Sequence, residues 1–310
     1  MAQSIKVFAP ATIANLGSGF DLLGLAINGA GDEIVVTENN LNKLFIEKIK
    51  GDENKLPLET IENTCTVAMQ AMLDELKIKT GFNVTINKQM PLGSGMGSSA
   101  ASAVGGVFAL NELLNKPFTK AELIKFALEG EYIASRGYHA DNIAPCMLGG
   151  ITFISSTQPL KVHALPCPDN FFITLLHQPV QILTAEARKI LPPHYTRDIV
   201  IKQNAAIASF VNGLHQNDFE SISFGLQDFI AEPYRKNLIP HYSELKNIAM
   251  QTGAVGYNIS GSGPAVFAVS SEKETAEKIA HVWKNYFIEI NSPCLCITSP
   301  INKEGVKIIS

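Results

Sequence analysis

Glycines and serines that could hold a phosphate group are concentrated in one segment, 91–101, which reads PLGSGMGSSAA. Glycine permits sharp turns that expose backbone N–H groups, and the first turn of a helix adds unpaired donors and a partial positive charge. The flanking residues alternate like a strand over 82–87 and are apolar like a buried helix over 98–114. This order predicts a phosphate-binding loop that opens a helix. The structural alternative is a serine-capped turn without a ligand.

Three common nucleotide-binding loops do not fit the segment. A Walker A loop ends in Gly-Lys-Ser/Thr, and no lysine lies within 91–101. The dinucleotide fingerprint requires a glycine where Ser98 stands and an acidic residue on the next strand, whereas 119–135 is predicted as a helix. The His-Arg-Asp and Asp-Phe-Gly tripeptides of protein kinases are absent from the sequence.

Carboxylates that could complete a metal site follow the loop. Glu129 and Glu131 stand near the end of a predicted helix over 120–135. A carboxylate that reaches back to the serines of the loop would form the oxygen-rich site that magnesium prefers. A solvent-exposed helix face is the alternative for either residue.

A polar segment, His139-Ala-Asp-Asn142, comes next and precedes an apolar stretch. Asp141 fits two roles in this context. It can cap the following helix, or it can orient or deprotonate the hydroxyl group of an acceptor while His139 and Asn142 position that acceptor.

Candidates for binding the acceptor lie far from the loop. Asn15 and Asp21 are the polar members of a glycine-containing turn near the N-terminus, where they could simply stabilise the turn. Arg188 and Arg235 each follow an acidic residue closely, so a surface ion pair of little energetic value is one interpretation. The other is that the two guanidinium groups clamp a substrate carboxylate. A second glycine turn, at 259–264, is an unremarkable hairpin by itself.

The composition is that of an ordinary globular protein, with 46% hydrophobic and 17% charged residues among 310. The formal net charge of −4 gives no basic excess, which argues against nucleic acid as a partner. No apolar run approaches the roughly twenty residues that span a bilayer, and no signal peptide is recognised, so we expect a cytoplasmic protein without a membrane partner. The five cysteines are scattered, which argues against a cysteine metal site.

Predicted helices and strands are grouped in blocks, which favours an α+β protein over a doubly wound sheet. A strand is predicted at 151–154, followed by a loop-rich passage that Pro159, Pro166 and Pro168 punctuate. A domain boundary is expected there. In the second half a helix is predicted at 220–230.

Three segments, 10–21, 91–101 and 260–265, resemble the motifs of the GHMP kinases, a superfamily of kinases that act on small molecules. The resemblance extends over essentially the whole chain, and the central motif is the most specific of the three. It implies a two-domain α+β fold. The ATP-binding domain would cover 1–155, with a left-over-right β-α-β unit carrying the phosphate loop, and a ferredoxin-like α+β domain would cover 156–310.

The resemblance also implies roles for individual residues. ATP and Mg²⁺ are the implied cofactors, with Ser99 and Glu131 as metal ligands that act in catalysis together with Asp141 and Asn142. The residues implied in ATP binding are Pro91, Leu92, Gly93, Ser94, Gly95, Met96, Gly97, Ser98, Ser99, Ala100, Ala101 and, on the adenine side, Asn63. The residues implied in acceptor binding are Asn15, Asp21, His139, Asn142, Thr184, Arg188, Arg235 and Gly261.

Within the superfamily, the segments 14–21, 139–142, 184–192 and 232–240 most resemble the branch that phosphorylates L-homoserine on the way to threonine. Homoserine is a zwitterion with a side-chain hydroxyl, so two arginines suit its carboxylate, while Asp21 and Asn15 suit its ammonium and hydroxyl end. A kinase for mevalonate or shikimate, or a non-catalytic nucleotide-binding regulator, is the alternative. The apolar second half would permit a homodimer.

The superfamily often uses the residue at Asp141 as a base and a nearby lysine to activate the hydroxyl. In this sequence Asn15 stands in the matching segment instead of a lysine. The proton of the acceptor then goes either to Asp141 or to the γ-phosphate itself, and in the second case Asn142 holds Asp141 away from the acceptor.

Overall fold

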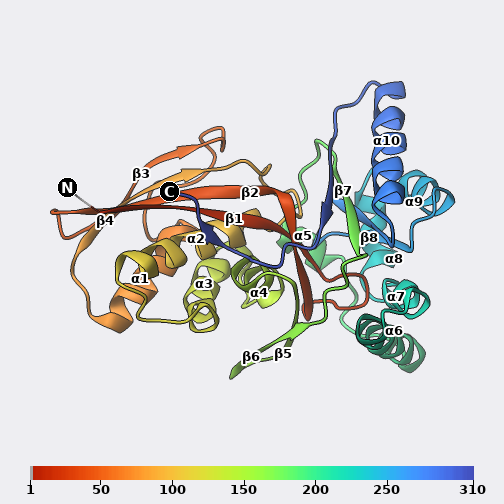
Figure 1. Ribbon diagram of the computed structural model, residues 1–310, viewed down its shortest axis with the longest axis horizontal. Coiled ribbons are helices and arrows are strands. Elements are labelled where there is room, and N and C mark those ends of the chain that lie inside the picture. Colours follow the sequence, from red (N-terminus) through yellow and green to blue (C-terminus); the bar gives the residue numbers. More distant parts are fainter. Residues whose placement is uncertain (1–2) are drawn as a thin grey trace.

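A seven-stranded sheet with helices against one face forms the larger part of the molecule (Figure 1). The computed structural model describes residues 3–310. The pairing order is β11-β1-β2-β4-β3, and β5 pairs with both β2 and β6. The strands are β1 (Ser4–Ala14), β2 (Leu23–Asn39), β3 (Leu44–Lys50), β4 (Gly81–Asn87), β5 (Ile151–Thr157), β6 (Leu160–Leu165) and β11 (Lys307–Ile308).

Three helices contact strands of this sheet: α1 (Thr64–Leu76), α2 (Ser98–Leu113) and α4 (Ala140–Leu148). A fourth helix, α3 (Lys120–Ser135), packs against these three. In β4 the buried residues Phe82, Val84 and Ile86 alternate with less buried neighbours, so one face of the strand meets the helices. Helix α2 is buried along nearly its whole length. Its Gly105 lies so close to Ile34 of β2 that no side chain would fit between them.

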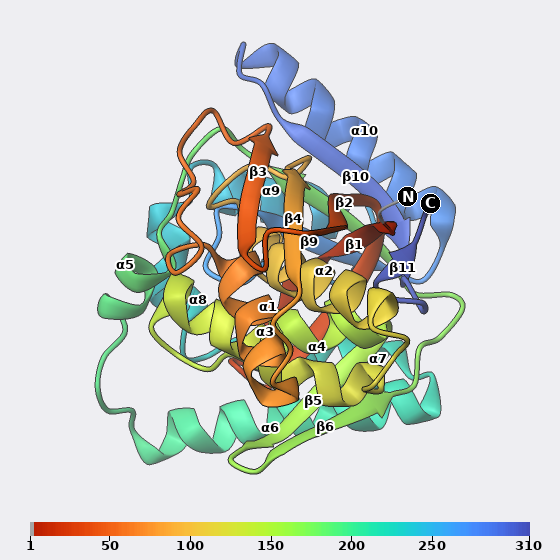
Figure 2. The ribbon, with the colours of Figure 1, turned by 90° about the vertical axis from the view of Figure 1, so that its left-hand side faces the viewer.

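A four-stranded antiparallel sheet forms the second part, with the order β10-β7-β9-β8. Its strands are β7 (Phe172–His177), β8 (Gly256–Ile259), β9 (Val266–Ser270) and β10 (Leu295–Pro300). The accompanying helices are α5 (Thr184–Lys189), α6 (Arg197–Gln216), α7 (Phe219–Gly225), α8 (Glu232–Arg235), the 3₁₀ helix η1 (Lys236–Leu238), α9 (Tyr242–Gln251) and α10 (Lys273–Glu289). Figure 2 shows α6 and α10 at opposite ends of the molecule. The strand order, with helices between β7 and β8 and between β9 and β10, is that of the predicted ferredoxin-like domain.

The two parts share an apolar core and are joined by a returning strand. Val7 and Ile34 of the larger sheet belong to the same buried cluster as Phe171 and Phe210 of the second half. Strand β11 pairs with β1, so the two ends of the chain lie close together (Figure 1). The domain boundary near residue 155 thus separates segments that pack together, and its position stays a prediction.

One local prediction is correct only in part, and another is wrong. The passage after residue 154 first forms a hairpin, because β6 folds back and pairs with β5, and only Pro166 and Pro168 lie in a loop that leads to β7. The helix expected at 220–230 ends at Gly225, since the Asp228 carboxylate accepts the backbone N–H groups of residues 230, 231 and 232 and turns the chain into α8. No helix within residues 3–310 has the length and apolar character needed to cross a membrane.

Candidate active site

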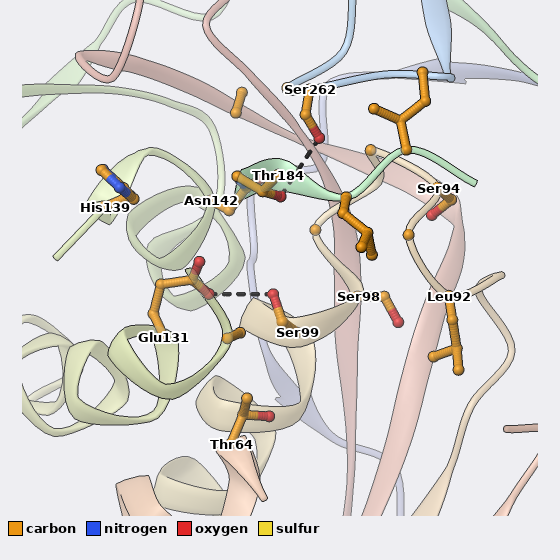
Figure 3. A pocket seen from close by; sticks show the side chains of 18 of the residues that line it. Thr64, Leu92, Ser94, Ser98, Ser99, Glu131, His139, Asn142, Thr184 and Ser262 are labelled. Carbon is orange, nitrogen blue, oxygen red and sulfur yellow. Dashed lines mark hydrogen bonds between the residues drawn. The ribbon is translucent and has the colours of Figure 1, made fainter. Parts of the chain in front are cut away.

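A cavity of about 490 Å³ lies between the two parts of the molecule, and both contribute to its walls. The loop before α2, the end of α3 and the start of α4 form one side (Figure 3). The segment 181–185, Arg188, Arg235 and the turn after β8 form the other. The phosphate loop and the proposed acceptor residues therefore share one cavity.

Backbone carbonyl groups of the phosphate loop are held from behind by other segments. Three successive carbonyls accept hydrogen bonds: Ser94 from the Ala265 N–H at 3.1 Å, Gly95 from the Ser260 hydroxyl at 2.6 Å, and Met96 from the Thr12 N–H at 3.0 Å. A trans peptide points its C=O and the next N–H in opposite directions, so the N–H groups of residues 95–97 face away from these partners. None of them has a hydrogen-bond partner within residues 3–310, which leaves three donors for an anion. The glycine turn of 259–264 thus supports the loop.

Gly97 shows why the loop requires glycine. Its φ is +73°, in the left-handed region, and it is the N-cap of α2. A Cβ at this position would overlap the Thr12 hydroxyl and come within 3.0 Å of Asn142 Oδ1. The loop is therefore packed against both β1 and α4 at this residue.

A buried ion pair that the sequence analysis missed lies beneath the loop. Lys88, just after β4, contacts Asp32 of β2, and the two side chains are 1% and 0% exposed. The Lys88 ammonium also donates to the Ser98 carbonyl at 2.7 Å and to the Ser102 hydroxyl at 2.9 Å. The pair connects the strand that enters the loop with the helix that leaves it. The only available signal was a lysine placed between an alternating strand and a glycine-rich loop.

The predicted metal ligands contact each other. The Ser99 hydroxyl donates to Glu131 Oε2 at 3.1 Å (Figure 3). Burial raises the pKa of Glu131 to about 7. Glu129, by contrast, is exposed, and its carboxylate accepts a hydrogen bond from the Tyr138 hydroxyl at 3.4 Å. Of the two candidate carboxylates, Glu131 is the one that reaches the loop.

Asp141 lies in the first turn of α4 and lines the cavity. The N-cap of α4 is His139, so the capping role considered for Asp141 is wrong. The residue is 4% exposed, and burial, reinforced by the charges of Asp21 and Glu131, raises the pKa of its carboxyl group to about 8. The neighbouring Asn142 accepts a hydrogen bond from the Thr12 hydroxyl at 2.7 Å.

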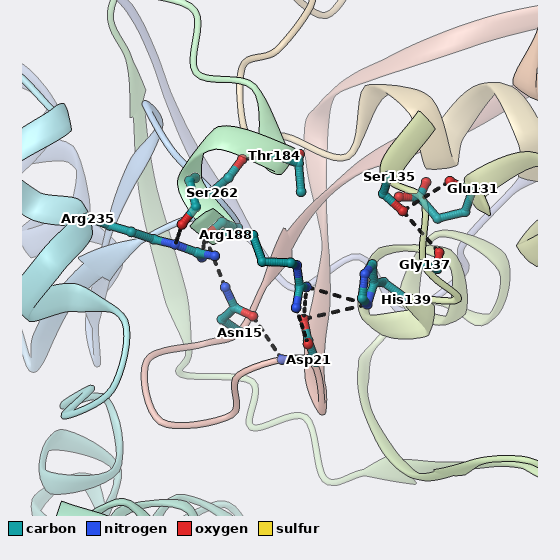
Figure 4. Close-up of polar contacts among 12 residues, drawn as sticks. Asn15, Asp21, Glu131, Ser135, Gly137, His139, Thr184, Arg188, Arg235 and Ser262 are labelled. Carbon is teal, nitrogen blue, oxygen red and sulfur yellow. Dashed lines mark hydrogen bonds and ion pairs between the residues drawn. The ribbon is translucent and has the colours of Figure 1, made fainter. Parts of the chain in front are cut away.

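An ion pair crosses the acceptor end of the cavity. Arg188 of α5 donates to both oxygens of Asp21, at 3.0 and 2.7 Å (Figure 4). His139 Nδ1 lies 3.5 Å from the same guanidinium group. Burial, together with the charge of Arg188, lowers the pKa of His139. Arg188 is therefore not engaged in a surface pair with the acid beside it in the sequence, and its partner comes from the other half of the molecule.

Arg235 is held more tightly than Arg188. It is 3% exposed and donates to the carbonyl groups of Ala187 at 3.1 Å and Gly261 at 3.0 Å. Asn15 Nδ2 donates to the same Gly261 oxygen at 3.0 Å, and Asn15 Oδ1 accepts the Asp21 N–H at 3.0 Å (Figure 4). The Asn15 side chain thus fixes the turn that carries Asp21.

Most of the predicted site residues line this one cavity. They include all predicted acceptor and catalytic residues and, among the ATP-binding candidates, Asn63, Leu92, Gly93, Ser94, Gly95, Gly97, Ser98 and Ser99. The remaining candidates, Pro91, Met96, Ala100 and Ala101, are not among the residues that form its walls. The sequence analysis missed several other lining residues, namely Leu56, Pro57, Lys88, Ser102, Gln181 and Ser262.

Asn63 is the N-cap of α1. Its Oδ1 accepts the Cys65 N–H at 3.0 Å and its Nδ2 donates to the Pro57 carbonyl at 3.0 Å. One N–H of the amide remains for a ligand. Its adenine contact stays a prediction.

Comparisons with known proteins agree with this geometry. Residues 63–150 match the model of the GHMP kinases N terminal domain, and residues 207–289 match that of the GHMP kinases C terminal domain. The fold, the phosphate loop and these matches define a GHMP kinase, as predicted. Kinases of this family use ATP.

Relatives that match nearly the full length of the chain show to which group of GHMP kinases it belongs. A homoserine kinase of Chlorobium phaeobacteroides is 39% identical, over 99% of this chain and 100% of its own, and one of Xylella fastidiosa is 33% identical, over 99% and 95%. The crystal structure of homoserine kinase from Cytophaga hutchinsonii superposes with a TM-score of 0.96 at 42% identity, covering 99% of this chain and 97% of that one. A Leishmania major mevalonate kinase, at 15% identity and a TM-score of 0.75, shares the fold. The chain belongs to the homoserine kinase family.

Proposed function

We propose that this protein transfers the γ-phosphoryl group of ATP to the side-chain hydroxyl of L-homoserine, giving O-phospho-L-homoserine and ADP. The observation that carries the proposal is the pair of opposite charges, Asp21 and Arg188, at one end of the phosphate-loop cavity. An ammonium group suits Asp21 and a carboxylate suits Arg188. Mevalonate lacks the ammonium group and a neutral sugar lacks both charges, so an amino acid fits this pair best.

Binding of a zwitterion would exchange partners rather than create unpaired charges. In the structure Asp21 and Arg188 neutralise each other, and an amino acid would supply each of them with a replacement of the correct sign. The two side chains are 31% and 34% exposed, so leaving either of them without a partner would cost on the order of 1 kcal/mol. A substrate with only one of the two charges would therefore bind less tightly, which supports homoserine over singly charged alcohols.

The residues present also fit Mg²⁺. Ser99 and Glu131 offer a hydroxyl and a carboxylate oxygen in contact with each other, which is the hard donor set that this ion prefers. No group of three His, Cys, Asp or Glu side chains within residues 3–310 could hold a metal by itself, so phosphate oxygens would complete the coordination. When bound, the ion would neutralise charge on the phosphate groups.

In the proposed reaction the acceptor oxygen bonds to the γ-phosphorus, and the bond from that phosphorus to the bridging oxygen of ADP breaks. The N–H groups of residues 95–97 would stabilise charge on the phosphate oxygens. The hydroxyl proton goes to Asp141 or to the transferred phosphoryl group. A kcat of Asp141→Asn within roughly tenfold of the parent would exclude Asp141 as general base, because general-base catalysis contributes about 10²–10⁴.

The experiment is a measurement of ADP release from MgATP with homoserine, mevalonate, shikimate and galactose, with the product identified by phosphorus NMR. We expect turnover with homoserine alone and none when EDTA removes the metal. Absence of turnover with all four compounds would favour the regulatory alternative.

A variant with both Arg188→Gln and Arg235→Gln tests the acceptor site. We expect KM for homoserine to rise at least about 100-fold while KM for ATP stays within about twofold, because two charge-assisted contacts are lost on one substrate only. Arg197→Gln, on the exposed start of α6, is the matched control. An unchanged KM for homoserine in the double variant would contradict the assignment of the substrate.

A further inference from the structure

Strand β1 is irregular where it passes the phosphate loop. Its pairing register with β2 shifts between Pro10 and Thr12. Such a bulge turns the side chains next to it in a new direction. Thr12 comes directly after the shift, has no exposed surface and does not line the cavity.

Thr12 nevertheless contacts both sides of the reaction site. Its N–H donates to the Met96 carbonyl at 3.0 Å, which holds the donor loop. Its hydroxyl donates to Asn142 Oδ1 at 2.7 Å, on the helix that also carries Asp141. These two contacts place a single residue between the phosphate loop and the start of α4.

The second contact determines how the Asn142 amide is turned. An amide has an acceptor side and a donor side, and a half-turn about its last bond exchanges them. With Oδ1 fixed by Thr12, the NH₂ group is free, because no residue within 3–310 accepts a hydrogen bond from it. Asn142 lines the cavity, as Figure 3 illustrates, so this group is available to a ligand there. A donor suits the negatively charged phosphate groups of ATP, whereas an amide oxygen would repel them.

Gly97 completes the arrangement. The space that its missing Cβ leaves is occupied by the Thr12 hydroxyl, with Asn142 Oδ1 beside it. The third glycine of the loop therefore makes room for the contact between Thr12 and Asn142.

We propose that Thr12 is a positioning residue for phosphoryl transfer, which acts by fixing the Asn142 amide with its NH₂ group toward the transferring phosphate. This inference rests on the proposed kinase activity. Without the hydroxyl, Asn142 Oδ1 would lose its buried donor and the amide could turn its oxygen toward the phosphate.

The test compares Thr12→Val, which keeps the shape and removes the hydroxyl, with Thr12→Ser, which keeps the hydroxyl. We expect Thr12→Val to lower kcat about 10- to 100-fold with both KM values within about twofold, a size typical of misplaced groups at a reaction site. Thr12→Ser should restore kcat to within about threefold of the parent. Thr152→Val is the matched control, because Thr152 is equally buried in the same sheet and its hydroxyl has no hydrogen-bond partner in the structure.

A double-mutant cycle with Asn142→Ala identifies the route of the effect. If Thr12 acts through Asn142, adding Thr12→Val to Asn142→Ala leaves kcat unchanged within about twofold. Should Thr12→Val fail to fold, Thr12→Ala takes its place in the same cycle.

Three results would overturn the inference: parental kcat in Thr12→Val, a loss in Thr12→Ser as large as in Thr12→Val, or a full additional loss on top of Asn142→Ala. Homoserine turnover by the parent enzyme distinguishes a failure of this inference from a failure of the proposed function. Absence of homoserine turnover in the parent contradicts the kinase proposal, and the inference with it. Turnover in the parent together with any of the three results contradicts the role of Thr12 alone.

Discussion

The two ends of the cavity are built from different chemical groups. The end at the phosphate loop, residues 93–99, is called the donor end, and the end at Asp21 and Arg188 is called the acceptor end. At the donor end, the N–H groups of residues 95–97 have no partner within residues 3–310, and the carbonyl groups of residues 94–96 accept hydrogen bonds from Ala265, Ser260 and Thr12. At the acceptor end, charged side chains from separate parts of the chain meet, and Arg188 pairs with Asp21. The donor end therefore offers backbone groups that the protein leaves unpaired, whereas a zwitterion bound as proposed would exchange partners with the ion pair of the acceptor end.

The two ends serve different purposes: one binds the phosphate groups of ATP, and the other selects the acceptor. Every GHMP kinase must bind the same phosphate groups, and a rigid backbone cradle does so without losing side-chain entropy. Selecting one small alcohol requires side chains whose charges match it. Substitutions at the donor end should therefore remove activity with any acceptor, and substitutions at the acceptor end should change which acceptor is used.

Gly97→Ala should have the largest effect. A Cβ would overlap Thr12, and the left-handed φ of +73° adds backbone strain. We expect kcat/KM for ATP to fall about 100- to 1000-fold with every acceptor, on the order of the loss of an oxyanion-hole donor. Gly253→Ala, with φ of +100° and an open surrounding, is the control for strain alone and should retain parental kinetics. Steady-state kinetics of both variants test this prediction. Parental kcat/KM in Gly97→Ala would show that the phosphate loop can accommodate a side chain at this position.

Lys88→Met should weaken the donor end next. The change leaves Asp32 buried without its cation, which costs about 3–5 kcal/mol of stability. Because the pair holds the first turn of α2, KM for ATP should rise about 10- to 100-fold while KM for homoserine changes little. Lys125→Met removes an exposed ion pair and should cost about 1 kcal/mol or less. Chemical denaturation measures the loss of stability, and steady-state kinetics measure KM for ATP. An unchanged KM for ATP would show that the ion pair stabilises the fold without affecting ATP binding.

Arg188→Gln and Arg235→Gln should differ from each other at the acceptor end. If both arginines bind the substrate carboxylate, as proposed, each substitution removes one contact and KM for homoserine should rise about 10- to 30-fold. Arg188 is 34% exposed at its side chain, so its loss should hardly change stability. Loss of Arg235 removes the donor to the Ala187 carbonyl and one of the two donors to the Gly261 carbonyl, and it should cost about 2 kcal/mol. Equal melting temperatures of the two variants would contradict this distinction between an exchangeable and a fixed arginine.

The last prediction concerns stability rather than the choice of acceptor: Asp141→Asn should change how the stability of the protein depends on pH. The pKa of Asp141 rises from 3.8 to about 8 on folding. The folded protein therefore holds more protons between these pH values, and stability falls as the pH rises through this range. Asparagine does not titrate, so the variant should have a higher Tm than the parent at pH 8.5 and a similar Tm at pH 4. Calorimetry across this range checks the prediction, and a difference in Tm that is constant with pH would contradict it.

The donor end could be predicted from the sequence because its determinants are contiguous. A phosphate loop is predicted from the spacing of the glycines at 93, 95 and 97 and from the serines that follow them. The helix over Lys120–Ser135 is predicted with its correct bounds. Lys88 and Thr12 could not be recognised in the same way. Their roles depend on contacts with Asp32 and Asn142 that only the folded sheet brings about.

The acceptor end was predicted as a set of residues but not as an arrangement. The sequence analysis gives Arg188 and Arg235 the same role, a clamp on the substrate carboxylate, because both carry a planar guanidinium group. In the structure one bonds to a carboxylate and the other to backbone carbonyls. Sequence spacing carries no information about partners from other parts of the chain, so this difference required the tertiary structure.

The pairing of β11 with β1 has a consequence for synthesis on the ribosome. Val7 pairs with Ile308, and Phe8 with Lys307, so one edge of β1 finds its partner only when a segment far along the chain has been made. At about 5–20 residues per second, that edge stays open for on the order of tens of seconds. Unpaired strand edges favour association with other chains. The strand that later holds Thr12 against the phosphate loop thus gives the nascent protein an open edge through which it can associate with other chains.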